Sequence, residues 1–281
     1  MSDEQSVLEA IDTFFNEPAQ DLGDEARETF EAFLDLMEAG ELRAAEPTDE
    51  GWVVNPAVKR GILLGFRLGE NVEMDSAGPL QFSDKDTYPA QRMPVTERNI
   101  RLVPGGNSVR RGAYLGHNVT MMPPAFVNVG AYVGDDTMVD SHALVGSCAQ
   151  VGARVHLSAA AQLGGVLEPI GQTPVIVEDD VMVGAHAGLF EGVQVGAGAV
   201  IGAGCVITAS TPVYDLVRQE VYRSGDDGPL RIPENAVVIP GSRPAKGDFA
   251  EEHGLQMSAL LIVKYRDEST DASTALEEML R

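Results

Sequence analysis

The stretch Val139-Asp140-Ser141-His142-Ala143-Leu144-Val145-Gly146-Ser147-Cys148-Ala149-Gln150-Val151 has an aliphatic residue at every sixth position. Stepping by six in both directions extends this pattern into one unbroken series, and a second series with the same period begins at Val177. The first series contains Val109, Leu115, Met121, Val127, Val133, Val139, Val145, Val151, Leu157 and Leu163, and the second contains Val177, Val183, Leu189, Val195, Ile201, Ile207 and Val213. We call these the ladder residues. A six-residue period fits neither an α-helix nor a long strand, but it is typical of the hexapeptide β-helix, in which short strands joined by corners stack around an apolar interior.

Glycine often follows a ladder residue, as at Gly134, Gly146 and Gly152. Because glycine adopts positive φ without steric cost, we expect these positions to be where the chain turns sharply. The ladder is interrupted once, since Leu163 and Val177 are fourteen positions apart. The excess around residues 164–176 must leave the coil as a loop, and such an excursion from a solenoid is a frequent place for function.

The sequence predicts a mainly β protein with three regions. Residues 1–100 form a helical and mixed domain, in which one helical pattern ends at Gly40 and another starts after Asn55-Pro56. Residues 101–213 form the β-helix. Residues 214–281 form a small β cap, with strand-like segments at 237–239 and 260–263 that cover the open end of the coil, and a short helix at 273–280.

The charge balance narrows the classes of partner. The 281-residue chain carries a net charge of −23, which disfavours binding to nucleic acid and to anionic membranes. It contains no apolar run long enough to span a membrane and no signal peptide at its N-terminus, so we expect a cytoplasmic protein with both cysteines reduced. The basic residues are 4 lysines and 16 arginines, and such an acidic, lysine-poor surface suits a salty cytoplasm.

Several short sequence motifs are more specific for one protein family than the ladder residues are. They are Leu42-Arg43-Ala44-Ala45-Glu46, Asn128-Val129-Gly130-Ala131-Tyr132-Val133, Thr137-Met138-Val139-Asp140, Val145-Gly146-Ser147-Cys148-Ala149-Gln150 and Gly164-Gly165-Val166-Leu167-Glu168-Pro169. In these motifs the chain resembles the tetrahydrodipicolinate N-succinyltransferase family, and the resemblance covers most of residues 40–265. The resemblance implies a left-handed coil and a homotrimer whose active sites are each shared by two neighbours. It also implies transfer of a succinyl group from succinyl-CoA to the amine of ring-opened tetrahydrodipicolinate (L-2-amino-6-oxopimelate), in the diaminopimelate route to lysine.

The resemblance also suggests which residues bind the acceptor. Asp140 is the first candidate for the group that binds the substrate amine and accepts its proton, and Glu168 in the extruded loop is the second. Arg101 resembles a family residue that holds a substrate carboxylate, for which a guanidinium is well shaped. The chain departs from the family at His142, where tryptophan is expected, and at Gly188, where some members carry a glutamate.

For the acyl donor we expect succinyl-CoA as a cosubstrate, with no tightly bound cofactor and no metal. Small residues such as Ala203 and Gly204 would let the pantetheine arm lie close to the coil backbone. The cations Arg243 and Lys246 are candidates for contact with the phosphates, because clustered positive charge is unusual in so acidic a chain.

Other functions are compatible with a hexapeptide coil. A related acyltransferase would act on another small amine or a sugar with acetyl-CoA, and His142 or His186 would serve as its base. A metal-dependent hydratase would need three converging histidines, but His117, His142 and His156 lie at different offsets from their ladder residues. A non-catalytic solenoid is the remaining alternative. Release of thiol from succinyl-CoA, with acetyl-CoA as control, separates these hypotheses.

Overall fold

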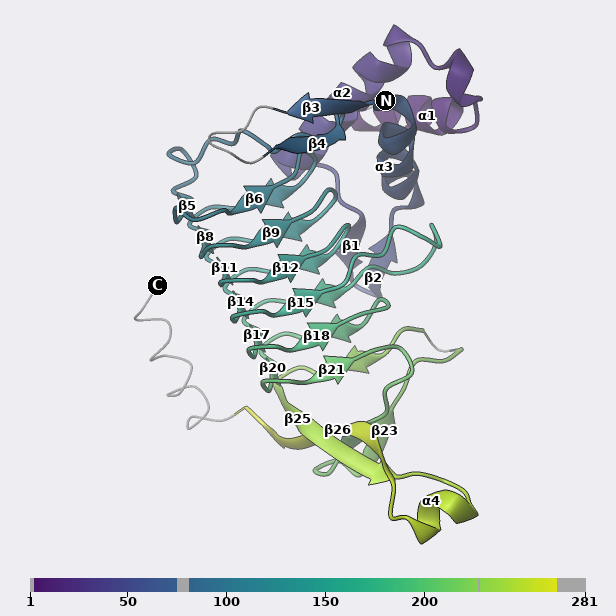
Figure 1. The fold of residues 1–281 in the computed structure, drawn as a ribbon, viewed down its shortest axis with the longest axis vertical. Coiled ribbons are helices and arrows are strands. Elements are labelled where there is room, and N and C mark those ends of the chain that lie inside the picture. The colour runs from purple at the N-terminus through teal and green to yellow at the C-terminus, as the bar shows by residue number, and fades with distance from the viewer. Residues whose placement is uncertain (1–2, 75–80, 227, 267–281) are drawn as a thin grey trace.

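The computed structural model describes residues 3–74, 81–226 and 228–266. A triangular β-helix forms the body of the molecule, with a helical domain at its N-terminal end and a long β ribbon at the other end (Figure 1). The chain therefore has the hexapeptide β-helix architecture that the period of six predicts, with the left-handed coil that the family resemblance implies.

The coil has three flat faces, each a parallel stack of two-residue strands that the chain visits in the order I, II, III. Face I contains β7 (Tyr114–Leu115), β10 (Tyr132–Val133), β13 (Gln150–Val151), β16 (Ile176–Val177), β19 (Gln194–Val195) and β24 (Arg231–Ile232). Face II contains β5 (Arg101–Leu102), β8 (Thr120–Met121), β11 (Met138–Val139), β14 (His156–Leu157), β17 (Met182–Val183), β20 (Val200–Ile201) and β25 (Ala236–Pro244). Face III contains β6 (Ser108–Val109), β9 (Phe126–Val127), β12 (Leu144–Val145), β15 (Gln162–Leu163), β18 (Gly188–Leu189) and β21 (Val206–Ile207).

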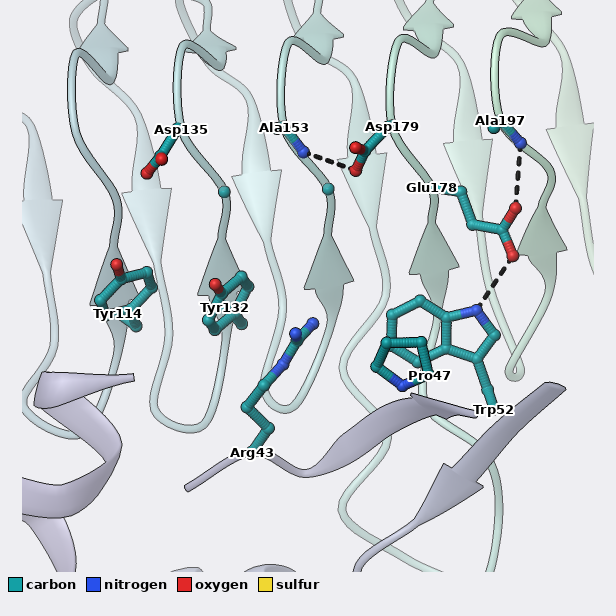
Figure 2. A pocket seen from close by; sticks show the side chains of 12 residues that line it. Arg43, Pro47, Trp52, Tyr114, Tyr132, Asp135, Ala153, Glu178, Asp179 and Ala197 are labelled. Atoms are coloured by element: carbon teal, nitrogen blue, oxygen red, sulfur yellow. Dashed lines mark hydrogen bonds between the residues drawn. The ribbon is translucent and has the colours of Figure 1, made fainter. Parts of the chain in front are cut away.

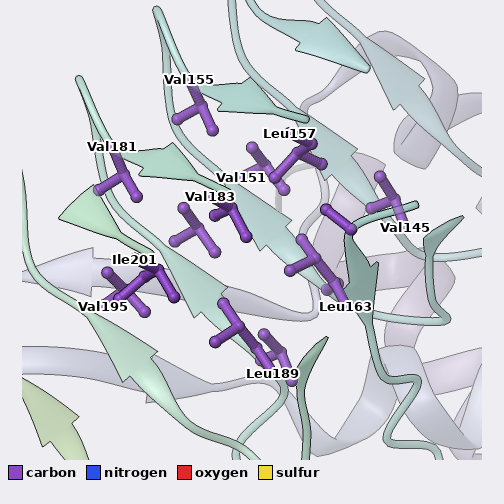
Figure 3. Packing of buried hydrophobic residues seen from close by; sticks show 14 of the residues in the cluster. Val145, Val151, Val155, Leu157, Leu163, Val181, Val183, Leu189, Val195 and Ile201 are labelled. Atoms are coloured by element: carbon purple, nitrogen blue, oxygen red, sulfur yellow. The ribbon is translucent and has the colours of Figure 1, made fainter. Parts of the chain in front are cut away.

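The ladder residues fill the interior, as predicted. Every one of them belongs to one continuous buried cluster. Val145, Val151 and Leu157 come from three consecutive faces and converge on the axis, and each later coil repeats this arrangement (Figure 3). Because complete burial of a valine or leucine side chain contributes about 1.5–3 kcal/mol, the ladder supplies much of the apolar driving force for folding.

The glycines that follow ladder residues have a different role from the one predicted. They do not adopt positive φ, which instead occurs two residues later in the corner, at positions such as His142, Cys148 and His186. A Cβ atom at Gly134 would lie 2.6 Å from the backbone of Gly152 in the next coil. Glycine is therefore required there because neighbouring coils approach closely, and not because of a left-handed turn.

The N-terminal domain contains three main helices and two hairpins. Its elements are α1 (Asp3–Phe15), the 3-10 helix η1 (Ala19–Asp21), α2 (Asp24–Ala39), β1 (Ala45–Thr48), β2 (Gly51–Val54), α3 (Pro56–Leu68), β3 (Asn71–Met74) and β4 (Phe82–Lys85). As the sequence indicates, α2 ends at Gly40 with φ 79°, and Asn55 Oδ1 caps α3 by accepting from the Ala57 amide at 3.2 Å.

This domain packs on the corner between faces III and I. The buried cluster around α2 and α3 includes Val129 and Cys148 from that corner. A Cβ atom at Gly130 would lie 2.7 Å from the side chain of Ile62, so this glycine permits the close approach of α3. Arg111 in the first coil pairs with three acids of α2, namely Glu31, Asp35 and Glu38.

The extruded loop leaves the coil at the same III–I corner, between Leu163 and Ile176. The buried ammonium of Lys59 in α3 donates to the carbonyl of Gln172, and Leu167 packs against the cluster of the N-terminal domain. The loop is thus attached to α3 rather than projecting freely.

The coil continues beyond residue 213, where the sequence places its end. Strand β24 pairs with β19 and strand β25 pairs with β20, so Ile232 and Val238 extend the ladder. The intervening segment carries β22 (Val213–Asp215) and β23 (Glu220–Tyr222), and Val213 joins the sheet next to β26 (Gln256–Tyr265). The antiparallel β25–β26 ribbon, with α4 (Asp248–Glu252) at its tip, then covers this end of the coil. The helix predicted at 273–280 lies outside the described residues.

Candidate active site

The corner between faces II and III forms a continuous edge of small residues. Ala159, Ala185 and Ala203 occupy equivalent places in successive coils, and backbone hydrogen bonds of 2.9–3.0 Å link these corners through His186 N to Ala159 O and Gly204 N to Ala185 O. Side chains this small leave the backbone accessible along the edge. Most of the residues that sequence reasoning selects lie on this edge or on face II beside it.

Asp140 is at the start of this edge, directly after β11. Its backbone amide donates to Leu157 O at 2.9 Å, and its Oδ1 accepts from the amide of Ser141 at 2.7 Å. Its Oδ2 lies 3.9 Å from Nε2 of His156, and the side chain keeps 30% of its exposure. The carboxylate is therefore held in place by the corner while one oxygen remains accessible to a substrate amine.

Arg101 lies on the same face, at the N-terminal end of the coil. Strand β5 pairs with β8, and β8 pairs with β11, so Arg101 is in register with Met138 two strands away. Two strand spacings amount to about 10 Å. Arg101 is exposed, and Asp140 follows Met138 by two residues, so both charged residues lie along face II and its edge.

Glu168 does not join this group within one chain. It is exposed in the loop at the III–I corner, whereas Asp140 lies at the II–III corner. The two carboxylates that the sequence selects therefore lie on different corners of the β-helix. A shared role in one site would require a second copy of the chain.

The predicted donor residues lie toward the C-terminal end. Ala203 and Gly204 are exposed at the II–III corner, three coils after Asp140, which corresponds to about 14 Å. Arg243 lies in β25 and pairs in register with Met257, and its Nε is enclosed with no hydrogen-bond acceptor among the described residues. Lys246 follows that strand and is exposed.

The structure explains why residue 188 carries no glutamate. A Cβ atom at Gly188 would lie 2.5 Å from the ring of Phe190, and a Cβ atom at Gly164 in the preceding coil would lie 2.7 Å from the same ring. The Phe190 ring thus occupies the space above both glycines on face III. Any side chain at 188 would have to displace it.

Sequence reasoning did not place His156 beside Asp140. The side chain of His156 is 12% exposed, and it stands in register between Met138 and Met182 on face II. The 18-residue length of a regular coil was the available signal, because it places residue 156 beside residue 138 and hence next to Asp140. His142 and His186, the bases of the alternative hypothesis, are exposed at the II–III corner with φ of 63° and 59°.

Within residues 3–74, 81–226 and 228–266, no group of three or more His, Cys, Asp or Glu side chains is arranged to hold a metal ion. No helix in the described part of the chain is long and apolar enough to cross a membrane.

Comparisons with known proteins match both parts of the fold. Residues 6–68 match the family model described as tetrahydrodipicolinate N-succinyltransferase N-terminal, and residues 174–209 match the hexapeptide repeat of succinyl-transferase. The chain is 42% identical to the 2,3,4,5-tetrahydropyridine-2,6-dicarboxylate N-succinyltransferase of Rhodopseudomonas palustris, covering 92% of this chain and 90% of that protein. It is 40% identical to the enzyme of the same name from Acinetobacter baylyi, covering 100% of this chain and 99% of that protein. A crystal structure of a putative N-succinyltransferase from Campylobacter jejuni is similar with a TM-score of 0.48 and 20% identity, covering 83% of this chain and 62% of that one.

The stacked six-residue coils and the matching repeat model define the class of this protein as a hexapeptide-repeat transferase. At about 40% identity over nearly the whole length of its relatives, the chain belongs to the 2,3,4,5-tetrahydropyridine-2,6-dicarboxylate N-succinyltransferase family.

Proposed function

We propose that this protein transfers the succinyl group of succinyl-CoA to the amine of ring-opened tetrahydrodipicolinate, at the edge between faces II and III. The observation that carries the proposal is the placement of Arg101, Asp140 and Ala203 along one face and its adjoining edge, in a chain of this family. The reaction serves the diaminopimelate route to lysine, and we place the protein in the cytoplasm.

The acceptor binds through its charges. Arg101 pairs with a substrate carboxylate, and the Asp140 carboxylate faces the substrate amine. An ammonium has no lone pair to attack with, so Asp140 accepts its proton. The free amine then attacks the thioester carbon, the C–S bond breaks, and the CoA thiolate takes up the second proton that the nitrogen loses as the amide forms. No acyl-enzyme is formed in this sequence.

The donor lies along the same edge. Its thioester is positioned near Asp140, and its pantetheine arm runs over Ala203 and Gly204 toward the β25–β26 ribbon. Arg243 and Lys246 on and after β25 are suited to the phosphates, because each brings a positive charge into a strongly acidic chain. Coenzyme A acts here as a cosubstrate that leaves after each turnover.

We also propose a homotrimer in which a neighbour completes each site. Val206 on face III keeps 55% of its exposure, so this face exposes an apolar side chain that another coil can cover. In such an assembly Glu168 of one chain is free to approach the edge of another. Light scattering at working salt tests this directly, and a monomer would contradict it.

The deciding experiment is thiol release from succinyl-CoA. Purified protein should release CoA only when tetrahydrodipicolinate or L-2-aminopimelate is present. Acetyl-CoA is the matched donor control, since it lacks only the distal carboxylate arm. Equal or faster turnover with acetyl-CoA would reject the succinyl assignment and favour the alternative acetyltransferase.

A further inference from the structure

A cavity lies on face I of the coil, away from the II–III edge. It has a volume of about 480 Å³, and the β1–β2 hairpin closes one side while face I and the I–II corner form the other. Trp52, Tyr114 and Tyr132 form aromatic walls, and Pro47 adds an apolar contact (Figure 2). Cavities of this size and mixed character are typical of small-molecule sites.

Arg43 reaches into this cavity from the hairpin (Figure 2). Its guanidinium carbon lies 3.7 Å from the centroid of the Tyr132 ring and 5.5 Å from that of Trp52. Its Nε donates to Gln150 Oε1 at 3.0 Å, which is its only hydrogen bond to the described residues. Burial lowers the pKa of Arg43 from its usual value. The two terminal nitrogens of a desolvated, fixed guanidinium are therefore left to bind an anion.

The acids that line the cavity are not equivalent. Glu178 accepts from Trp52 Nε1 at 3.0 Å and pairs with Arg231 at 3.2 Å, and Asp179 pairs with Arg154 at 3.2 Å. The carboxylate of Asp135, in contrast, accepts a hydrogen bond only from the neutral backbone amide of His117, at 2.8 Å, among the described residues. Once these ion pairs are set aside, the lining retains one positive charge at Arg43 and one negative charge at Asp135.

We infer that this cavity binds a small zwitterionic amino acid. Its carboxylate would pair with the terminal nitrogens of Arg43, its ammonium with Asp135, and its side chain would lie against the aromatic walls of the cavity. A ligand with only a negative charge would leave Asp135 without a positive partner. A ligand with only a positive charge would be repelled by Arg43. Since Asp140 and Ala203 lie at the II–III corner, this site is separate from the candidate active site and does not depend on the proposed reaction.

Fluorescence provides a direct test, because Trp52 is the single tryptophan of the chain and lines the cavity. The full-length protein is titrated with L-norleucine, with hexanoate, which lacks the amine, and with pentylamine, which lacks the carboxylate. Norleucine should change the emission saturably, with a midpoint in the micromolar to low-millimolar range. Each single-charge analogue should bind at least about tenfold more weakly, since hydrogen bonds to charged groups are worth that much.

Substitutions at Asp135 and Arg43 test the proposed contacts with the ammonium and the carboxylate of the ligand separately. Asp135→Asn keeps an acceptor for the His117 amide while removing the charge, and it should weaken norleucine at least about tenfold. Arg43→Gln should do the same, and if it unfolds the hairpin, Asp135→Asn alone decides. Asp136→Asn is the matched control, because Asp136 is adjacent in the same corner but outside the cavity lining. Absence of saturation with norleucine, hexanoate binding as tightly as norleucine, or an equal loss in Asp136→Asn would each overturn the inference.

Discussion

Nε2 of His156 lies 3.9 Å from Oδ2 of Asp140, across the neighbouring strands β14 and β11 of face II. The two residues belong to successive coils, and Met138 and Met182 flank the imidazole on either side. From this placement beside the carboxylate we propose that His156 helps to orient Asp140, as a positioning residue that does not itself touch the amine.

Replacement of Asp140 tests the proposed proton acceptor. Asp140→Asn keeps the shape of the side chain and an oxygen for the Ser141 amide, but it removes the base. The turnover number should fall by about 10²-fold or more, the usual scale for loss of a general base. Steady-state thiol release measures this effect, with Asp136→Asn as the control for charge. If Asp140→Asn retains most activity while Glu168→Gln loses it, then Glu168 is the acceptor.

The positioning role of His156 predicts a smaller and coupled effect. His156→Asn should lower the turnover number by about tenfold, less than the direct acceptor, because orientation and not the base itself is lost. In an Asp140→Asn background the same change should have almost no further effect, since residues that act as one unit are non-additive. A double-mutant cycle on the turnover number gives the coupling. Full additivity of the two losses would show that His156 has only a structural role.

The contact between Gly188 and Phe190 predicts a conditional substitution. Gly188→Glu should destabilise the protein by about 1–3 kcal/mol, because the new side chain collides with the ring of Phe190. In a Phe190→Ala background the penalty should largely disappear. Urea unfolding of the single and double variants measures both free energies. Gly225→Glu is the matched control, since a Cβ atom at Gly225 would meet no other atom within 4 Å. An equal penalty for Gly188→Glu with and without Phe190 would refute this account.

The period of six was sufficient to predict the coil, its interior and its one interruption, because each ladder position reports the same local requirement. The docking of the loop could not be predicted, since it depends on Lys59 reaching Gln172 from a helix more than one hundred residues earlier. The return of the coil at β24 was likewise hidden by the excursion between Ile207 and Arg231, because the count of six ends at Val213 within it. Asp140 and Arg101 were selected by resemblance, whereas the proximity of His156 to Asp140 follows only from the register of the strands.

Both cysteines should be inert in the folded protein. Burial raises the pKa of the Cys148 thiol to about 12 and that of Cys205 to about 11. Because only the thiolate reacts, very little of either residue is reactive at pH 8. A chromogenic disulfide reagent should therefore titrate close to no thiol in native protein and two per chain in urea. Rapid labelling of native protein would show that one of these sites opens frequently.

Salt should stabilise the protein and strengthen its binding of the acyl donor. Each chain carries a net charge of −23, so three chains that associate bring strongly acidic surfaces together, and coenzyme A adds further negative charge. The Debye length is about 30 Å at 0.01 M ionic strength and about 3 Å at 1 M, so repulsion acts across much of a subunit only in dilute buffer. The melting temperature and the apparent affinity for succinyl-CoA should both rise as KCl increases from about 0.05 to 1 M. Thermal melts and donor titrations across this range provide the measurement.

Neutralising the exposed pair Asp49 and Glu50, by Asp49→Asn and Glu50→Gln, should make both curves shallower. Flat or falling curves would show that the acidic surface is incidental to stability and to donor binding.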